Sequence, residues 1–154
     1  MSTAKPEFEP RDPGFQDKVR TSFARQRIMD TLSAELTTVA PGKVTIQMPF
    51  NQAMTQQHGF LHAGIIGTIA DSACGYAAFS LMPAGAAVLS VEYKLNLLAP
   101  AEGQDFVATG QVLKSGRTLT VCNAEVEAIT EAGRKLIASM TATMMTITGR
   151  GIRD

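Results

Sequence analysis

The segment from residue 62 to residue 81, HAGIIGTIADSACGYAAFSL, constrains the fold more than any other part of this 154-residue chain. It is long enough for a helix of about five turns. Its apolar residues occur on every side of such a helix, which indicates burial on most sides. Gly64, Gly67 and Gly75 are poor helix formers, so we expect them where another backbone or a ligand approaches closely. Pro83 and Gly85 are predicted to end the helix.

Runs with strand patterns lie on both sides of this segment. Residues 34–39 and 43–49 precede it and are separated by a Pro-Gly turn. In residues 89–97 apolar and polar side chains alternate, the pattern of a strand with one buried face. In the later run 118–129 the apolar phase switches between Val121 and Cys122, which predicts a β-bulge. Turns at 114–116 and 131–133 separate the remaining runs, residues 106–113, 118–129 and 136–144.

The element order predicts an α+β domain. Residues 1–13 are expected to form a loose arm, and residues 15–32 a modest amphipathic helix. The length matches one domain, so we expect a single domain over 1–154, with the arm and helix over about 1–32 and the core over about 34–148. One long helix among six strand runs favours an antiparallel sheet that curls around that helix.

Composition narrows the possible partners. Fourteen basic and fourteen acidic residues balance, so no global charge attracts nucleic acid or an anionic membrane. The most apolar window is interrupted by Asp71 and several glycines, which argues against a membrane span. Cys74 and Cys122 form no spacing motif and are expected to be reduced. The polar, Pro-rich start does not resemble a secretory signal, so we expect a cytoplasmic protein.

Asp71 is the first candidate for chemistry. It is the one formally charged side chain between Val44 and Val91, and both histidines, His58 and His62, fall in the same run. A carboxylate among apolar residues costs several kcal/mol unless it is paired, hydrogen-bonded or protonated. A chain that keeps such a group usually uses it, which favours a catalytic role. The alternative is a carboxylate that bonds only to Thr68 or to nearby backbone.

The stretch QQHGFLHAG, residues 56–64, followed by Ala70-Asp71, resembles the signature of the PaaI-like hotdog acyl-CoA thioesterases. The resemblance extends from about residue 37 to residue 147. It implies the hotdog fold, an acyl-CoA substrate and no cofactor. By position, Gln56 takes the place of an amide donor, and His62-Ala63-Gly64 the place of a His-Gly-Gly motif. Ala63 stands where the middle glycine of the motif is usual. The backbone N–H is kept, but the added methyl group narrows the space through which a thioester approaches it.

Three more groups take roles from the same resemblance. Asp71 takes the place of the acid two turns along the helix. Ser90 takes the place of a strand hydroxyl that holds water in some members. The run Lys114-Ser115-Gly116-Arg117 corresponds to a turn near the nucleotide of coenzyme A and would meet its phosphates, although a solvated hairpin is the plain alternative.

Thioester hydrolysis explains these residue types independently. Negative charge develops on the carbonyl oxygen, so hydrogen-bond donors must point there. The first N–H groups of a helix lack internal partners, which makes the Ala63 and Gly64 N–H groups candidates beside the Gln56 amide. Asp71 then activates water or attacks the carbonyl itself, and both routes stay open. For His62 we favour a structural role at the helix start, and we expect no metal site because no further ligand lies near His58, His62 and Asp71.

Geometry predicts how the chain assembles. Ala63 and Asp71 are eight residues apart, about 12 Å along a helix, too far for both to touch one carbonyl carbon. An antiparallel two-fold pair of helices would bring Asp71 of one chain to Ala63 of the other. We therefore expect an obligate homodimer with composite sites at the subunit interface, and leave a homotetramer open. Two other functions stay open, a hotdog dehydratase or hydratase of acyl thioesters and a non-catalytic acyl-CoA-binding module.

Overall fold

The structure is a computed structural model that describes residues 7–152 and residue 154. The first six residues of the expected N-terminal arm lie outside the described residues. Two short helices precede the sheet, and a third, longer helix follows its first two strands. In chain order the elements are α1 (Phe15–Ala24), α2 (Arg27–Thr31), β1 (Glu35–Ala40), β2 (Lys43–Pro49), the 3-10 turn η1 (Gln52–Met54), α3 (Ala63–Phe79), β3 (Ala87–Leu97), β4 (Asp105–Ser115), β5 (Leu119–Thr130) and β6 (Gly133–Ile147).

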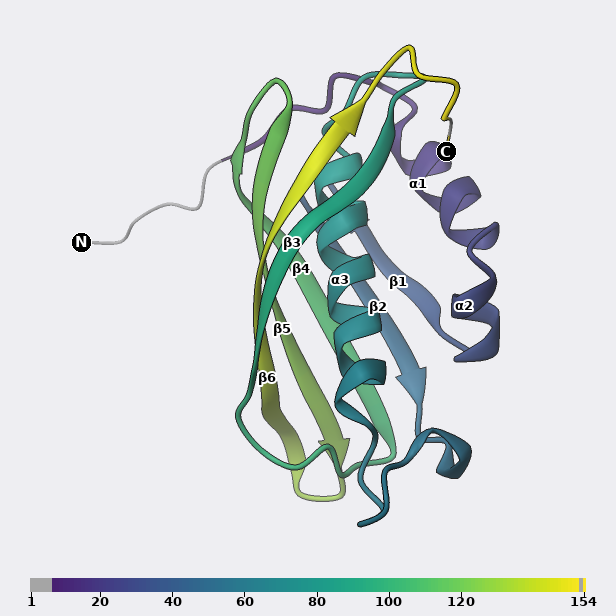
Figure 1. The fold of residues 1–154 in the computed structure, drawn as a ribbon, viewed down its shortest axis with the longest axis vertical. Coiled ribbons are helices and arrows are strands. Elements are labelled where there is room, and N and C mark those ends of the chain that lie inside the picture. Colours follow the sequence, from purple (N-terminus) through teal and green to yellow (C-terminus); the bar gives the residue numbers. More distant parts are fainter. Residues whose placement is uncertain (1–6, 153) are drawn as a thin grey trace, which may run out of the picture.

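One six-stranded sheet holds the fold together, with the order β1-β2-β4-β5-β6-β3 and antiparallel pairing throughout. Figure 1 shows α3 lying along one face of the curved sheet, with α1 and α2 to one side of it next to β1. The expected α+β architecture with a hotdog arrangement is confirmed. The four last strands do not pair in chain order, because β3 crosses over to β6 and leaves β4 between β2 and β5.

Helix α3 forms the centre of the core, as its apolar pattern predicts. Ile66, Ile69 and Phe79 are almost fully buried, and the helix contacts every strand from β2 to β6. A glycine that the sequence analysis did not select sets the closest approach. A Cβ at Gly110 of β4 would lie 2.3 Å from the carbonyl carbon of Ala73, so only glycine lets the helix sit at this depth. Gly75, by contrast, faces open space.

The single helix expected over residues 15–32 is wrong. The chain breaks at Gln26, which has extended backbone angles (φ −84°, ψ 93°) and lies between α1 and α2. No proline or glycine lies at the break. Residues 24–27 are Ala, Arg, Gln and Arg, all of which have good intrinsic helix propensity. Tertiary contacts on both sides of the break therefore override the local preference.

The expectation of a buried face on β3 is wrong for the single chain. Leu89, Val91, Tyr93 and Leu97 are between 46% and 56% exposed, although Leu95 packs partly against the core. β3 is also an edge strand, with only β6 beside it. An edge that displays large apolar side chains is prone to pair with another strand. The alternating pattern indicates which face of the strand favours burial. It does not indicate whether the same chain supplies an element that covers this face.

The prediction of a bulge within residues 118–129 is wrong, since the bulge lies on the neighbouring strand β4. The register of β4 against β5 shifts at Leu113, opposite Val121 and Cys122, while β5 keeps a continuous inward phase. A second bulge at Ile137 of β6 turns Ile137 inward and leaves Leu136 exposed. The extra residue shifts the alternation of β6 by one position, so Leu136 lies on the opposite side from Ala138.

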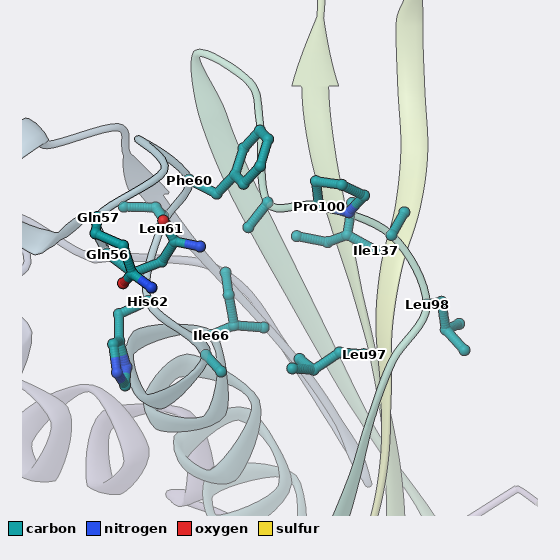
Figure 2. Close-up of a pocket in the computed structure, with 13 residues that line it drawn as sticks. Gln56, Gln57, Phe60, Leu61, His62, Ile66, Leu97, Leu98, Pro100 and Ile137 are labelled. Carbon is teal, nitrogen blue, oxygen red and sulfur yellow. The ribbon is translucent and has the colours of Figure 1, made fainter.

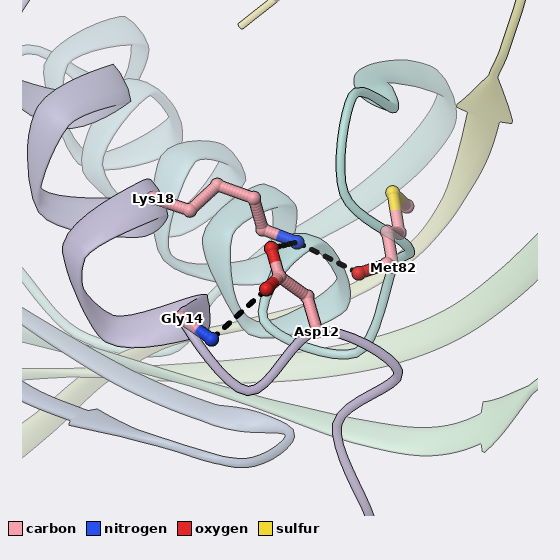
Figure 3. A network of polar contacts seen from close by, with 4 residues as sticks. All are labelled: Asp12, Gly14, Lys18 and Met82. Atoms are coloured by element: carbon pink, nitrogen blue, oxygen red, sulfur yellow. Dashed lines mark hydrogen bonds and ion pairs between the residues drawn. The ribbon is translucent and has the colours of Figure 1, made fainter.

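A polar network fixes α1 against the end of α3 (Figure 3). Lys18 Nζ lies 3.3 Å from Asp12 Oδ2 and donates to the Met82 carbonyl at 2.7 Å. Its ammonium also lies 4.7 Å from the centre of the Phe79 ring. Asp12 in turn accepts from the Gly14 N–H at 2.9 Å, and this bond, with Lys18 beside it, lowers the pKa of the carboxyl. The N-terminal helices are thus bonded to the core rather than resting loosely on it.

Within the part of the chain that the structure describes, no helix is long and apolar enough to cross a bilayer. Both cysteines are free and buried. Burial raises the pKa of the Cys122 thiol to about 12 and raises the pKa of the Cys74 thiol further. Neither thiol is therefore a nucleophile near neutral pH.

Candidate functional site

The start of α3 provides one free backbone donor. His62 is the N-cap, with extended backbone angles, and its Nδ1 accepts from the Gly64 N–H at 2.9 Å. The His62 carbonyl accepts from the Ile65 N–H at 2.9 Å. Among the described residues the Ala63 N–H has no such partner. Of the two expected oxyanion donors, Ala63 is therefore available, while the Gly64 N–H is occupied by the cap.

The capping bond also explains why a histidine stands at this position. Because Nδ1 accepts a hydrogen bond, the neutral His62 ring carries its proton on Nε2. The ring sets the direction in which the chain enters α3, which supports the structural role expected for His62. His58, further along the loop, lies against the Gln57 amide and does not line the pocket at the helix start.

A pocket of about 480 Å³ opens beside the free Ala63 N–H. Figure 2 shows Gln56, Gln57 and His62 grouped on one side of it, and apolar side chains on the other. No formally charged side chain lines the pocket. Its lining consists of Gln56, Gln57, Phe60, Leu61, His62, Ala63, Ile66, Leu97, Leu98, Ala99, Pro100, Ala101 and Ile137.

A tight turn places Gln56 at this pocket. The Gln56 N–H donates to the Phe60 carbonyl at 2.9 Å, and its carbonyl accepts from Gly59 at 3.0 Å. Gly59 has φ +87°, a conformation that glycine adopts without strain. The Gln56 side-chain oxygen accepts from the His58 N–H. With its oxygen held in this way, the amide leaves its NH₂ group as a donor beside the helix start.

Asp71 lies two turns further along α3 and is half-buried. Its Oδ1 accepts from the Ser90 hydroxyl of β3 at 2.7 Å. Thr68 instead donates to the Gly64 carbonyl at 2.8 Å, so the alternative in which Asp71 bonds to Thr68 is not observed. The pairing of a helix carboxylate with a strand hydroxyl joins two residues that the sequence analysis selected separately.

A second, smaller cavity of about 90 Å³ contains this acid. Burial raises the pKa of the Tyr76 phenol, which borders the cavity, and the hydrogen bond between Tyr76 and Ser22 partly offsets this. The cavity is lined by Gln26, Asp71, Ser72, Gly75, Tyr76, Val88, Ser90 and Asp154.

The structure does not bring all of the expected catalytic residues together in one chain. Gln56, His62 and Ala63 line the pocket at the helix start, whereas Asp71 and Ser90 line the second cavity. The eight residues from Ala63 to Asp71 separate the two groups by about 12 Å along α3. One chain therefore has the candidate oxyanion donors, the donor half, at one place and the candidate acid with Ser90, the acid half, at another.

The expected nucleotide-binding turn is more distant still. Lys114 and Ser115 end β4, and Gly116 and Arg117 follow in the β4–β5 hairpin. Figure 1 shows this hairpin at the end of the sheet opposite to the start of α3, and eleven residues of β4 span roughly 35 Å. Arg11 donates to the Gly116 carbonyl at 3.2 Å, which adds a third basic residue to the hairpin.

Sequence reasoning missed two parts of these cavities. One wall of the larger pocket comes from the last residue of β3, Leu97, and from residues 98–101 after it, where no periodic pattern indicates a site. Gln26 enters the smaller cavity from the break between α1 and α2, a break that local propensity did not predict. Within the described residues no group of three or more histidine, cysteine, aspartate or glutamate side chains could hold a metal ion.

Comparison with known proteins places this geometry in a family. The family model of the Thioesterase superfamily matches residues 58–135, which include the start of α3, Asp71 and Ser90. The chain belongs to the thioesterase superfamily. It is therefore a thioester hydrolase by family, and the expected resemblance to PaaI-like hotdog thioesterases is confirmed.

Individual members of the thioesterase superfamily agree with this assignment. Human acyl-coenzyme A thioesterase 13 is 36% identical over 104 residues, which cover 67% of this chain and 72% of that protein. A thioesterase family protein from Silicibacter pomeroyi is 56% identical, with a TM-score of 0.87 over 88% of this chain and 100% of that chain. The PaaI protein of the phenylacetic acid degradation operon of E. coli is 20% identical and shares the fold, with a TM-score of 0.79 over 90% of this chain and 97% of that chain.

Proposed function

We propose that the chain hydrolyses acyl-coenzyme A thioesters to a free acid and coenzyme A, at composite sites between two copies. The observation that carries the proposal is the division of the catalytic groups. The donor at the helix start and the carboxylate with its hydroxyl lie in two different cavities of one chain. The names of the human and Pongo abelii relatives, acyl-coenzyme A thioesterase 13, support the substrate class.

The donor half stabilises the charge that develops during hydrolysis. The thioester carbonyl oxygen accepts from the Ala63 N–H and from the Gln56 amide, and the dipole of α3 adds positive potential at this end. His62 holds the first turn of the helix by capping Gly64. The uncharged pocket beside these donors receives the hydrophobic part of the substrate.

The acid half supplies the base. Asp71 takes a proton from water, the water oxygen attacks the carbonyl carbon, and the C–S bond breaks to release the thiolate of coenzyme A, which is then protonated. Direct attack by Asp71, followed by hydrolysis of the mixed anhydride, is the second route. In both routes the Ser90 hydroxyl fixes Asp71 Oδ1 and leaves the other oxygen for the reaction.

A homodimer completes the site. The exposed apolar edge of β3 offers a surface for pairing with the same strand of a second copy, and a two-fold axis there sets the two α3 helices antiparallel. Asp71 of one copy then meets the Ala63 N–H of the other. The same two-fold axis places the β4–β5 hairpin of the second copy near the start of α3. Lys114 and Arg117 of that hairpin would there meet the phosphates of coenzyme A. A homotetramer would contain two such dimers.

Subunit complementation tests the composite site. Asp71→Asn removes the base, and Gln56→Ala removes an oxyanion donor, so each homodimer is expected to hydrolyse a panel of acyl-coenzyme A substrates at least about 100-fold more slowly than wild type. A mixed dimer has one intact site, because its Asp71 and its Gln56 come from different copies. Random mixing of the two variants should therefore restore about a quarter of wild-type thiol release.

Three results would overturn the proposal. If mixing restores nothing while light scattering shows that mixed dimers form, each site lies within one chain. If wild-type protein binds acyl-coenzyme A without releasing thiol, the chain is a binding module, and if it hydrates or dehydrates the acyl group instead, it is a hydratase or dehydratase.

We also infer that the protein works in the cytoplasm. The support is the state of Cys74 and Cys122, which are free and buried, as is usual in a reducing compartment. Cell fractionation with an antibody to the native protein tests this inference, and recovery in an extracytoplasmic fraction would contradict it.

A further inference from the structure

We propose that Gln26 is a further residue of the acid half, whose side-chain NH₂ group holds the water that attacks the thioester beside Asp71. The proposal rests on the proposed function and adds a residue from the N-terminal helices, outside the segment that the family model matches. Three observations carry it: the cavity, the hydrogen bonds around it, and the break in the helix that brings Gln26 there.

The cavity is the first observation. Gln26, Asp71 and Ser90 line the same space of about 90 Å³, which has room for a few water molecules. It also has polar partners for them, an amide, a carboxylate and a hydroxyl. Tyr76 and Asp154 are the other titratable residues on its lining. A water here can be bonded by more than one group, as a fixed water requires.

The hydrogen bonds show which atoms remain for that water. Ser72, which is 8% exposed, donates to Gln26 Oε1 at 3.2 Å, and Ser90 donates to Asp71 Oδ1 at 2.7 Å. Among the described residues, Gln26 Nε2 and Asp71 Oδ2 have no partner. A donor and an acceptor are therefore left on two oriented side chains that border one small cavity. A water between them donates one proton to Asp71 Oδ2 and accepts a hydrogen bond from Gln26 Nε2. These two bonds fix the orientation of the water.

The break between α1 and α2 is the third observation. Residues 24–27 favour a continuous helix, yet the backbone at Gln26 is extended. Buried contacts fix both sides of the break, since Phe23 packs on Tyr76 with ring centres 5.7 Å apart and Met29 is 1% exposed. Local preference and tertiary structure conflict at the residue that enters the acid cavity, and such conflicts are typical of functional positions.

The reaction balances with the groups at hand. Asp71 takes one proton from the water, whose oxygen forms a bond to the carbonyl carbon, and the C–S bond breaks with its electron pair on sulfur. Gln26 keeps its protons and only orients the water. Losing this donor should therefore slow the chemical step without weakening acyl-coenzyme A binding.

A pair of variants separates this role from a structural one. Gln26→Met keeps the length of the side chain and removes the amide, and we expect kcat to fall at least about ten-fold with KM within about two-fold of wild type. Ser72→Ala removes the bond to Gln26 Oε1 but keeps the NH₂ donor, and we expect kcat to fall less than about three-fold. If the Ser72–Gln26 bond only tethers the helices to α3, both variants remove the same bond and lose activity equally, which would overturn the proposal.

The controls keep the result interpretable. Gln16→Met changes a glutamine of α1, which donates to the Val39 carbonyl at 3.4 Å outside the cavity, and should leave kcat at the wild-type value. If Gln26→Met does not fold, Gln26→Glu preserves the acceptor for Ser72 and removes the donor, and a wild-type kcat for this variant would equally refute the role of Gln26. A wild-type protein without thioesterase activity refutes the proposed function instead.

Discussion

At the scale of single residues, environment decides which polar groups can react. Asp71 is half-buried, accepts from Ser90 and lines a cavity. Cys74 and Cys122 lie in the same core without a charge partner, and burial raises the pKa of each thiol. Two kinds of potential nucleophile in one domain therefore differ in reactivity because of their surroundings.

The buried thiols predict how stability depends on pH. In the unfolded chain both thiols lose their protons near pH 9.0, whereas folded Cys122 keeps its proton up to about pH 12 and folded Cys74 keeps its proton as well. The unfolded state then binds fewer protons, so the free energy of unfolding falls as the pH rises above about 9. The expected slope is up to about 1.4 kcal/mol per pH unit for each thiol.

Denaturant unfolding at a series of pH values measures this slope. The matched variant carries Cys74→Ala and Cys122→Ala, which lowers stability at every pH by removing core volume but removes the thiol contribution to the slope. Wild type and variant with equal slopes between pH 9 and pH 11 would contradict the assignment of the pH dependence to the thiols.

At the scale of elements, the depth of α3 in the sheet depends on one residue of a strand. Gly110→Ala places a methyl group 2.3 Å from the Ala73 carbonyl, and backbone cannot move aside as a flexible side chain can. We expect the variant to lose about 3 kcal/mol of unfolding free energy or to fail to fold. Urea denaturation measures the loss.

A glycine with space around it provides the comparison for Gly110. Gly14, the N-cap of α1, has φ −86° and only a contact of 3.4 Å to the Asp12 carboxylate at its added Cβ. Gly14→Ala should change stability by a few tenths of a kcal/mol. A similar small effect for Gly110→Ala would mean that α3 packs less closely than this structure shows.

At the scale of the whole molecule, the exposed apolar edge of β3 and the divided candidate site are both explained by the proposed second copy. Val91→Lys puts a charge on that edge and opposes strand pairing. We expect the variant to sediment as a monomer and to lose at least about 100-fold in thioesterase activity, because each proposed site combines groups from both copies. Circular dichroism should show that the fold of each chain is retained.

A substitution of the same type elsewhere on the surface controls for charge and solubility. Ile28 of α2 is 44% exposed and lies away from β3, so Ile28→Lys should leave both the mass in solution and the activity unchanged. A fully active monomer of the Val91 variant would remove the basis for composite sites.

The sequence by itself determined the parts that local physics controls. Period and apolar content predicted α3 and its burial, whereas the choice of Asp71 as the acid from its isolated charge stays a prediction. Position in a recognisable motif placed His62 and Ala63 at the helix start. The predictions about α3 succeed because a side chain's periodicity and polarity act over a few residues.

Only the tertiary structure decided which elements meet. It paired β3 with β6 and left an apolar edge, shifted Ile137 inward through a bulge, broke the N-terminal helix at Gln26, and bonded Ser90 to Asp71. Each of these results depends on contacts between residues far apart in the chain. A local pattern records which face of an element favours burial, and the partner that covers that face is set by the free energy of the whole packed molecule.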